Sequence, residues 1–320
     1  MNGVIKVIEK AAYVLSVLIG IVIANSCTIF DSRPPAAEKA PAVSEPEQKA
    51  AASGRQNYGS YLAGRVAHIR HDLNKAADYY KDAVAHVPDK QMLPSQLYIM
   101  LTSQGRIDEA VRYAQMAREK GDESPFIYTI EAINLTKHGK YQEAIDLLAA
   151  TTEYPHNLGE GKLPGAQEND IDYYRGIAYQ ALGNQEKSEF YFRKASEGLS
   201  EPAPAIYYND QQPDKIFYQG LAWEALGNPE NARKRFNKLI SYGEKHLFDQ
   251  VKIDYFAVSL PDLLIWEDDL QKRNTIHCYY LMALGYLGLK KYDEAKTYFD
   301  KVLKMDINHQ GAHIHRKMCE

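Results

Sequence analysis

The fold is decided by three stretches that share one frame: residues 73–86 (LNKAADYYKDAVAH), 107–120 (IDEAVRYAQMAREK) and 141–150 (YQEAIDLLAA). Each stretch carries an alanine at the same point of the frame, and these alanines lie 34 residues apart: Ala76, Ala110 and Ala144. A fixed period of this length indicates stacked helical units, because one helix pair cannot bury its apolar face alone.

The same frame continues later in the chain, displaced by insertions, at Ser188, Ala232 and Ala295. The helix that precedes each of these stretches has a small residue where its partner would cross: Gly64, Ala132, Gly176, Gly220 and Ala283. The second repeat departs from this rule, with Tyr98 at that place. A turn glycine follows in most repeats, as Gly105, Gly139, Gly183 and Gly227, where the chain leaves a helix in a left-handed conformation.

Together these positions resemble the tetratricopeptide repeat (TPR) family. The resemblance implies an all-α fold, namely a right-handed superhelical solenoid of about six helix-turn-helix repeats over residues 57–320. Insertions are expected near 154–169, 199–213 and 242–274; the first two are rich in Pro and Gly, and the third is apolar enough for one or two extra helices.

The N-terminus has the pattern of an export signal or membrane anchor. Lys6 and Lys10 precede Ala11 to Phe30, a run of 20 residues without charge. The run ends in ANSC, which resembles a bacterial lipobox with Cys27 as the lipidated residue, although Asn25 is atypical. An uncleaved anchor, plain cleavage and a buried helix are the alternatives. We expect a helix within residues 1–30, a disordered linker over 31–56, and an extracytoplasmic, membrane-anchored protein at the periplasmic face or surface of a bacterium.

The overall composition argues against a charged partner. The chain has 320 residues and a net charge of -4, so no bulk field favours nucleic acid or an anionic membrane surface. Its three cysteines, Cys27, Cys278 and Cys319, show no CxxC spacing, which leaves open whether the last two pair.

No motif for catalysis, metal or cofactor binding is present in the sequence. His309, His313 and His315 form the densest histidine group, and a frayed polar tail explains them better than a metal site. The acidic run 267–269 is best explained as a helix N-terminus. We therefore expect no enzyme, no metal and no cofactor.

The TPR resemblance places the ligand site on the concave face, along the first helix of each repeat. Many positions carried over are aromatic or aliphatic, so the carboxylate clamp of chaperone-binding relatives is absent. Such a face suits an amphipathic helix or an apolar peptide, although about half of these side chains could instead be inter-repeat core. The residues are Tyr58, Tyr61, Arg65, His68, Met92, Ile99, Phe126, Ile133, Tyr173, Phe217 and Tyr280.

The leading functional prediction is a membrane-tethered, non-enzymatic scaffold or adaptor that binds protein or peptide partners. The alternative is a glycan-binding or accessory protein in polysaccharide handling. It rests on residues 255–313, which resemble the C-terminal part of large uncharacterised bacterial TPR proteins that often carry a mutarotase-like domain upstream. That domain is not part of this sequence, so the resemblance implies no carbohydrate activity here. The oligomeric state stays open.

Overall fold

The computed structural model describes residues 58–70, 72–86, 92–122, 124–153, 162, 166–204, 212–251 and 269–320. The predicted leader, the linker and Cys27 lie outside these residues, as do most of the three insertions. Within the described ranges every regular element is a helix, which confirms the all-α prediction. No helix in these ranges is both long and apolar enough to cross a bilayer.

The helices form successive antiparallel hairpins. A first helix over residues 58–69 pairs with α3 (Leu73–His86). The next four hairpins are α4 (Met92–Ser103) with α5 (Ile107–Glu119), α6 (Pro125–Lys137) with α7 (Tyr141–Ala150), α8 (Asn169–Ala181) with α9 (Gln185–Ser196), and α10 (Pro213–Ala225) with α11 (Pro229–His246). The sixth joins α12 (Leu270–Gly288) to α13 (Tyr292–Met305), and α14 (Gln310–Lys317) follows it.

Close helix crossings within the hairpins depend on the small residues that the sequence placed there. A Cβ added to Gly64 would lie 2.6 Å from the ring of Tyr80, and one added to Gly176 would lie 2.6 Å from that of Phe192. Real Cβ atoms do not approach other atoms so closely, so an aromatic side chain of the second helix takes the space that a larger residue would need. The second repeat solves the crossing differently: α4 and α5 still pair, with Tyr98 buried between its neighbours.

The turns between paired helices also follow the sequence. Gly139, Gly183 and Gly227 all have a φ of 75°, in the left-handed region that glycine enters without a steric cost. In the last hairpin Lys290 takes this place with a φ of 62°. The turn geometry is therefore kept even where the glycine is missing.

The insertion predicted at 242–274 is partly helical. Its described portions extend α11 to His246 and begin α12 at Leu270. Asp269 caps α12, because its side chain accepts a hydrogen bond from the backbone N–H of Lys272 at 2.9 Å. Asp269, the last residue of the acidic run, therefore lies at a helix N-terminus, as predicted.

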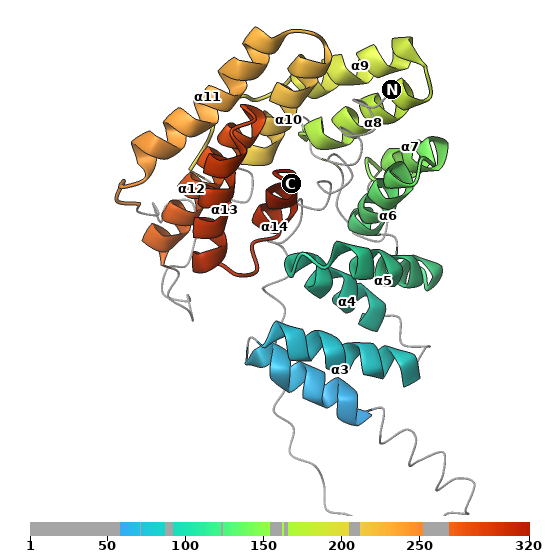
Figure 1. Cartoon of the computed structure of the whole chain (residues 1–320). Coiled ribbons are helices and arrows are strands. Elements are labelled where there is room, and N and C mark those ends of the chain that lie inside the picture. Colours follow the sequence, from blue (N-terminus) through green and yellow to red (C-terminus); the bar gives the residue numbers. More distant parts are fainter. Residues whose placement is uncertain are drawn as a thin grey trace, which may run out of the picture.

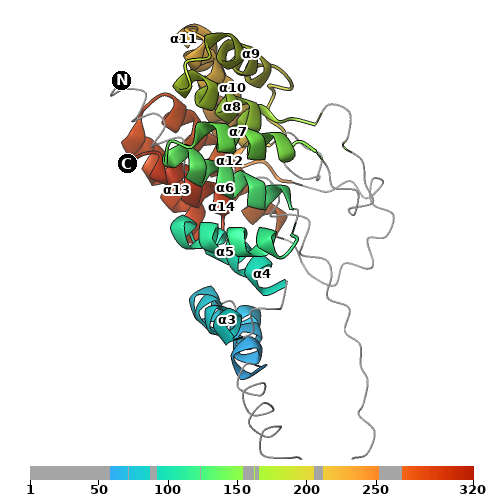
Figure 2. The same cartoon turned by 90° about the vertical axis from the view of Figure 1, so that its right-hand side faces the viewer.

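The hairpins stack in chain order and then turn back. In Figure 1 they rise from the first helix and α3 at the bottom to α10 and α11 at the top, and α12 to α14 return toward the middle. Figure 2 shows the same return from the side, with α14 among the earlier helices. Helix α14 contacts α12 and α13, and it also reaches α4, far earlier in the chain. The last helix therefore closes the curve of the stack.

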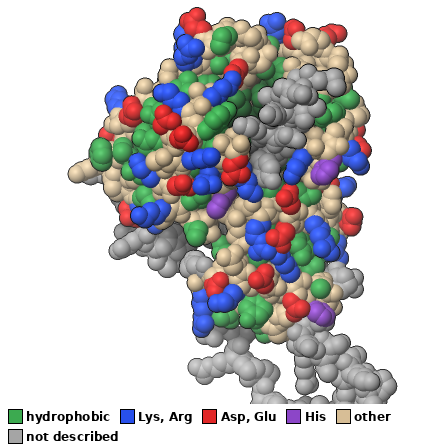
Figure 3. All heavy atoms as spheres, viewed as in Figure 1, with side chains coloured by type: hydrophobic (Ala, Val, Ile, Leu, Met, Phe, Trp, Pro, Cys, Tyr) green, Lys and Arg blue, Asp and Glu red, His purple; other side chains and the backbone are tan. Residues whose placement is uncertain are grey.

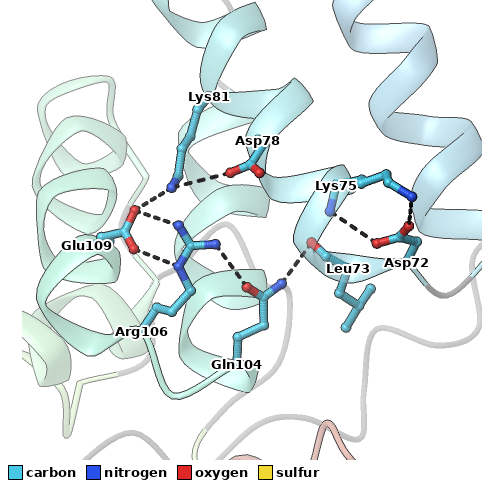
Figure 4. A network of polar contacts seen from close by, with 8 residues as sticks. All are labelled: Asp72, Leu73, Lys75, Asp78, Lys81, Gln104, Arg106 and Glu109. Atoms are coloured by element: carbon cyan, nitrogen blue, oxygen red, sulfur yellow. Dashed lines mark hydrogen bonds and ion pairs between the residues drawn. The ribbon is translucent and has the colours of Figure 1, made fainter.

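A polar network holds the first hairpin to the second (Figure 4). The Glu109 carboxylate lies between Lys81 of α3 and Arg106, whose Nε donates to it at 2.6 Å. Gln104 donates to the Leu73 carbonyl at 2.8 Å and accepts from Arg106. Because Arg106 and Lys81 both hydrogen-bond its carboxylate, the pKa of Glu109 falls to about 2.

Candidate functional site

The candidate site is the surface carried by the first helix of each hairpin, which we call the inner face. It comprises helix 58–69, α4, α6, α8, α10 and α12. All the residues predicted to bind a partner lie on these helices. They differ strongly in whether a partner could reach them.

The N-terminal part of the inner face is open. Tyr58, Arg65 and His68 are exposed on helix 58–69. Tyr61 is half-buried, with its ring centroid 6.1 Å from that of Tyr80 on α3. Ile99 is half-buried on α4. Met92 begins α4 and Phe126 lies in the first turn of α6, so both belong to the same stretch of the inner face.

The C-terminal part of the inner face is filled. Ile133, Tyr173, Phe217 and Tyr280 are all buried, and all four belong to one hydrophobic cluster. The prediction that these four side chains are accessible to a partner is therefore wrong. They form inter-repeat core, which was the alternative interpretation. The reason is aromatic packing from neighbouring helices, together with α14.

Helix α14 packs on this face through His315, which is fully buried. The His315 ring lies edge-on to Phe217 of α10, with centroids 5.5 Å apart, and its Nδ1 lies 3.0 Å from the hydroxyl of Tyr280. A Cβ on Gly311 would lie 2.3 Å from that hydroxyl, so a larger residue at this position would prevent α14 from packing this closely on α12. The prediction of a frayed histidine tail is wrong, because apolar packing of α14 offsets the cost of ordering it.

Burial sets the protonation state of His315. Its Nδ1 is 2.8 Å from the Gly311 carbonyl, which can only accept, so Nδ1 carries the proton. Nε2 is then a bare acceptor, buried without a hydrogen-bond partner. Desolvation lowers the pKa of His315 from 6.5 to about 3, so the ring is neutral at physiological pH.

A buried polar cluster joins α8 to α10, and sequence reasoning missed it. Lys215 forms an ion pair with Asp170, and both side chains are almost fully buried. Asp214 is buried beside them, and one of its carboxylate oxygens has no hydrogen-bond partner. Burial raises the pKa of Asp214 to about 6. One signal was available: Asp170 and Asp214 each lie six positions before the crossing glycine of their repeat, Gly176 and Gly220.

Neither the histidines nor the cysteines form a metal or disulfide site in the described part of the chain. No group of three or more His, Cys, Asp or Glu side chains there could hold a metal ion. Cys278 and Cys319 are both buried and form no disulfide with each other, which answers the question that the sequence left open. Burial raises the pKa of Cys278 to about 12, so it stays protonated.

The surface shows no single-sign patch on the face seen in Figure 3, where Lys and Arg side chains alternate with Asp and Glu. Some surface charges pair between elements: Lys238 of α11 pairs with Glu201 in the segment after α9, and Arg316 of α14 pairs with Asp300 of α13. Such a surface provides general solubility rather than a concentrated field.

Comparison with known families decides the architecture. A tetratricopeptide-repeat model matches residues 276–309, which span most of α12 and all of α13. A second tetratricopeptide-repeat model matches residues 216–242, in α10 and α11. The chain contains tetratricopeptide (TPR) repeats. Both matches coincide with hairpins in which a small residue crosses an aromatic one, so the earlier hairpins of the same geometry extend the TPR stack.

Several solved structures are similar to this TPR protein at low identity. A crystal structure of MamA protein is 19% identical, with 63% of this chain and 100% of that chain covered and a TM-score of 0.39. A tetratricopeptide repeat protein from Parabacteroides merdae is 16% identical, with 83% and 99% covered and a TM-score of 0.39. YrrB, described as a TPR protein with an unusual peptide-binding site, is 15% identical, with 74% and 97% covered and a TM-score of 0.32. The assignment depends on the repeat matches and not on these likenesses.

Proposed function

We propose that this TPR protein is a non-enzymatic scaffold that binds a protein or peptide segment on the N-terminal part of its inner face. The observation that carries the proposal is the division of that face: α14 fills the C-terminal part, whereas helix 58–69 keeps exposed side chains and Ile99 on α4 stays half-buried. TPR repeats are protein-interaction modules, and a partner needs accessible side chains that are already held in place.

The chemistry of the open part fits an amphipathic partner segment. Tyr61 and Ile99 supply half-buried apolar surface, with Tyr61 supported from behind by Tyr80. Arg65 and His68 add exposed polar groups at the rim. A segment with an apolar face and an acidic edge would match both, because aromatic anchors supply binding energy and rim charges orient the partner.

A pull-down with the full chain tests this site. We expect a Tyr61→Ala/His68→Ala/Ile99→Ala variant to lose at least tenfold of the partner recovered with wild type, in line with the loss of about three apolar or polar anchors. The matched control is Tyr79→Ala/Arg112→Ala, which changes exposed side chains on α3 and α5, the second helices of the same hairpins. Equal recovery from both folded variants would reject the site.

Membrane attachment through the N-terminus is part of the same proposal. The uncharged run from Ala11 to Phe30 follows Lys6 and Lys10, and Cys27 occupies the position of a lipidated cysteine. The scaffold would then face the periplasm or the cell surface. Metabolic labelling with a fatty acid tests this: Cys27→Ala should abolish the label, and an unlabelled wild-type protein would exclude lipidation.

The glycan-binding alternative remains a separate prediction, because no feature of the inner face favours a sugar over a peptide. A glycan array distinguishes the two functions. Binding to a defined glycan that the Tyr61→Ala/His68→Ala/Ile99→Ala variant loses would replace the scaffold proposal.

A further inference from the structure

Helix 58–69 exposes a continuous apolar stripe at the end of the stack. Four large apolar side chains form this stripe, and each is 48–70% exposed, which is unusual for four such residues on one helix. They are Tyr58, Leu62, Val66 and Ile69. At roughly 100° of turn per residue, these four fall within about a quarter of the helix circumference. They form one narrow face and not a scatter of exposed residues.

At the Leu62 and Val66 positions of the stripe, the corresponding face is buried in every later repeat whose residue is apolar. At the Ile69 position it is not, since Ala181 is half-buried and Ala225 is exposed. Counted from the crossing position, the equivalents of Leu62 are Ile130, Tyr174, Tyr218 and Leu281, each no more than 3% exposed. The equivalents of Val66 in the second, fourth and fifth repeats are also buried: Met100, Ala178 and Ala222. In a TPR stack this face packs on the hairpin before it. No hairpin precedes helix 58–69 in the described residues, so a stacking surface is left uncovered there.

The charges around the stripe indicate what covers it. Arg65 lies at one edge of the stripe and Arg70 at the other, and both are exposed. Residues 58–70 contain no Asp or Glu. An apolar centre with arginines along both edges suits a helix lying at the surface of an anionic bilayer, where the apolar side chains enter the acyl boundary and the guanidinium groups reach lipid phosphates.

We propose that helix 58–69 is a membrane-contact surface that lies flat on anionic phospholipid. A second copy of the chain is a poorer occupant, because two such helices face to face would bring Arg65 and Arg70 of both copies together without an acidic residue on either helix. Only 27 residues separate Tyr58 from the uncharged run that ends at Phe30. If that run is held in the membrane, helix 58–69 is held near the same surface at a high effective concentration.

This contact is additional to the N-terminal anchor, and its surface shares only Tyr58 and Arg65 with the proposed partner site. It would fix the orientation of the stack, with the first hairpin at the membrane and α10 and α11 pointing away from it. The open part of the inner face would then lie next to the bilayer, where a membrane-bound partner could reach it.

Photo-cross-linking of the full chain in vesicles tests the proposal. Leu62 or Ile69 is replaced by p-benzoylphenylalanine, and the matched controls carry it at Phe248 or Ile307, which are equally apolar and strongly exposed elsewhere in the molecule. In vesicles of phosphatidylcholine with phosphatidylglycerol we expect lipid adducts at Leu62 and Ile69, identified by mass, and none above background at the two controls.

The charge dependence gives a second readout. We expect the lipid adduct at Leu62 to fall about tenfold when phosphatidylglycerol is omitted, and by a similar factor in an Arg65→Gln/Arg70→Gln variant. Adducts with a second copy of the chain, equal lipid adducts at all four positions, or no adduct in protein that floats with the vesicles would each overturn the proposal. An adduct that is insensitive to phosphatidylglycerol would overturn the assignment to anionic lipid. The partner pull-down is read out on protein, so the two proposals can fail separately.

Discussion

Tyr61 and Tyr280 occupy the same position in the first and the last repeat, three residues before the crossing residues Gly64 and Ala283. Tyr61 is half-buried, whereas Tyr280 is only 4% exposed and lies against His309 and His315. The two side chains are identical, and both lean on an aromatic residue of the second helix, Tyr80 or Phe299. The two tyrosines differ in what covers them, because α14 packs on Tyr280 whereas Tyr61 stays partly exposed. In a repeat protein the same residue can thus be a binding position at one end and core at the other.

The largest expected difference in stability is the one between a Tyr280 truncation and a Tyr61 truncation. Tyr280→Ala should destabilise the protein by about 3–5 kcal/mol, because it leaves a cavity and removes the contact with α14. Tyr61→Ala should cost only about 1 kcal/mol, since its neighbours can relax into solvent. Urea unfolding of both variants measures the difference in free energy of unfolding. Equal losses would mean that α14 does not distinguish the two ends.

Acid should destabilise the packing of α14 on the C-terminal part of the inner face before it affects the N-terminal part. The pKa of His315 is about 3 in the folded protein and near 6.5 in the unfolded chain, so below about pH 6.5 only the unfolded state takes up the proton. The stabilisation is complete above that pH and is lost at about 1.4 kcal/mol per pH unit as the pH falls toward 3. Hydrogen exchange across α14 between pH 7 and pH 4 measures the loss.

A His315→Phe variant is the control for this pH dependence. It keeps an aromatic ring against Phe217 and Phe299 but has no proton to bind. The raised pKa of Asp214, about 6, acts in the opposite direction, because the folded state then holds a proton that the unfolded state releases. The difference between wild type and variant isolates His315, and identical pH profiles would refute its role.

The contact between α14 and α4 should be weaker than the aromatic packing. Lys317 donates from Nζ to the Gly105 carbonyl at 2.6 Å and so forms a polar link between α14 and the second hairpin. Lys317→Met should cost about 1–2 kcal/mol and should lower the protection of α14 amides without changing that of helix 58–69. Unchanged protection in α14 would show that packing alone holds it.

The smallest effect is expected at the open end. Glu109→Gln should destabilise the joint between the first two hairpins by less than about 1 kcal/mol, because Glu109 and Arg106 are partly solvated. The pKa of Glu109 is depressed to about 2, so its contribution is present above about pH 4.5 and is lost as the pH falls toward 2. Titration of the carboxyl by NMR checks the pKa, and a value near 4.5 would contradict the network in Figure 4.

The repeat pattern predicted the hairpins because small and large residues at fixed spacing report packing inside one repeat. Gly176 and Phe192 meet within one hairpin, and Gly183 turns the chain between its two helices. Contacts between distant repeats leave no such spacing. The burial of Tyr280 depends on His315, and the link from Lys317 to Gly105 joins residues 212 positions apart. The open and filled parts of the inner face could not be separated without the structure.

The link between α14 and α4 also bears on how the protein is made. A ribosome releases the chain from the N-terminus, and domains made of local contacts can fold as they emerge. Each hairpin can therefore form during synthesis, but residues 310–317 emerge only after all six hairpins. Until then Phe217 and Tyr280 lack the contact with His315 of α14. This eight-residue helix thus covers the aromatic side chains of α10 and α12 only after every hairpin has left the ribosome.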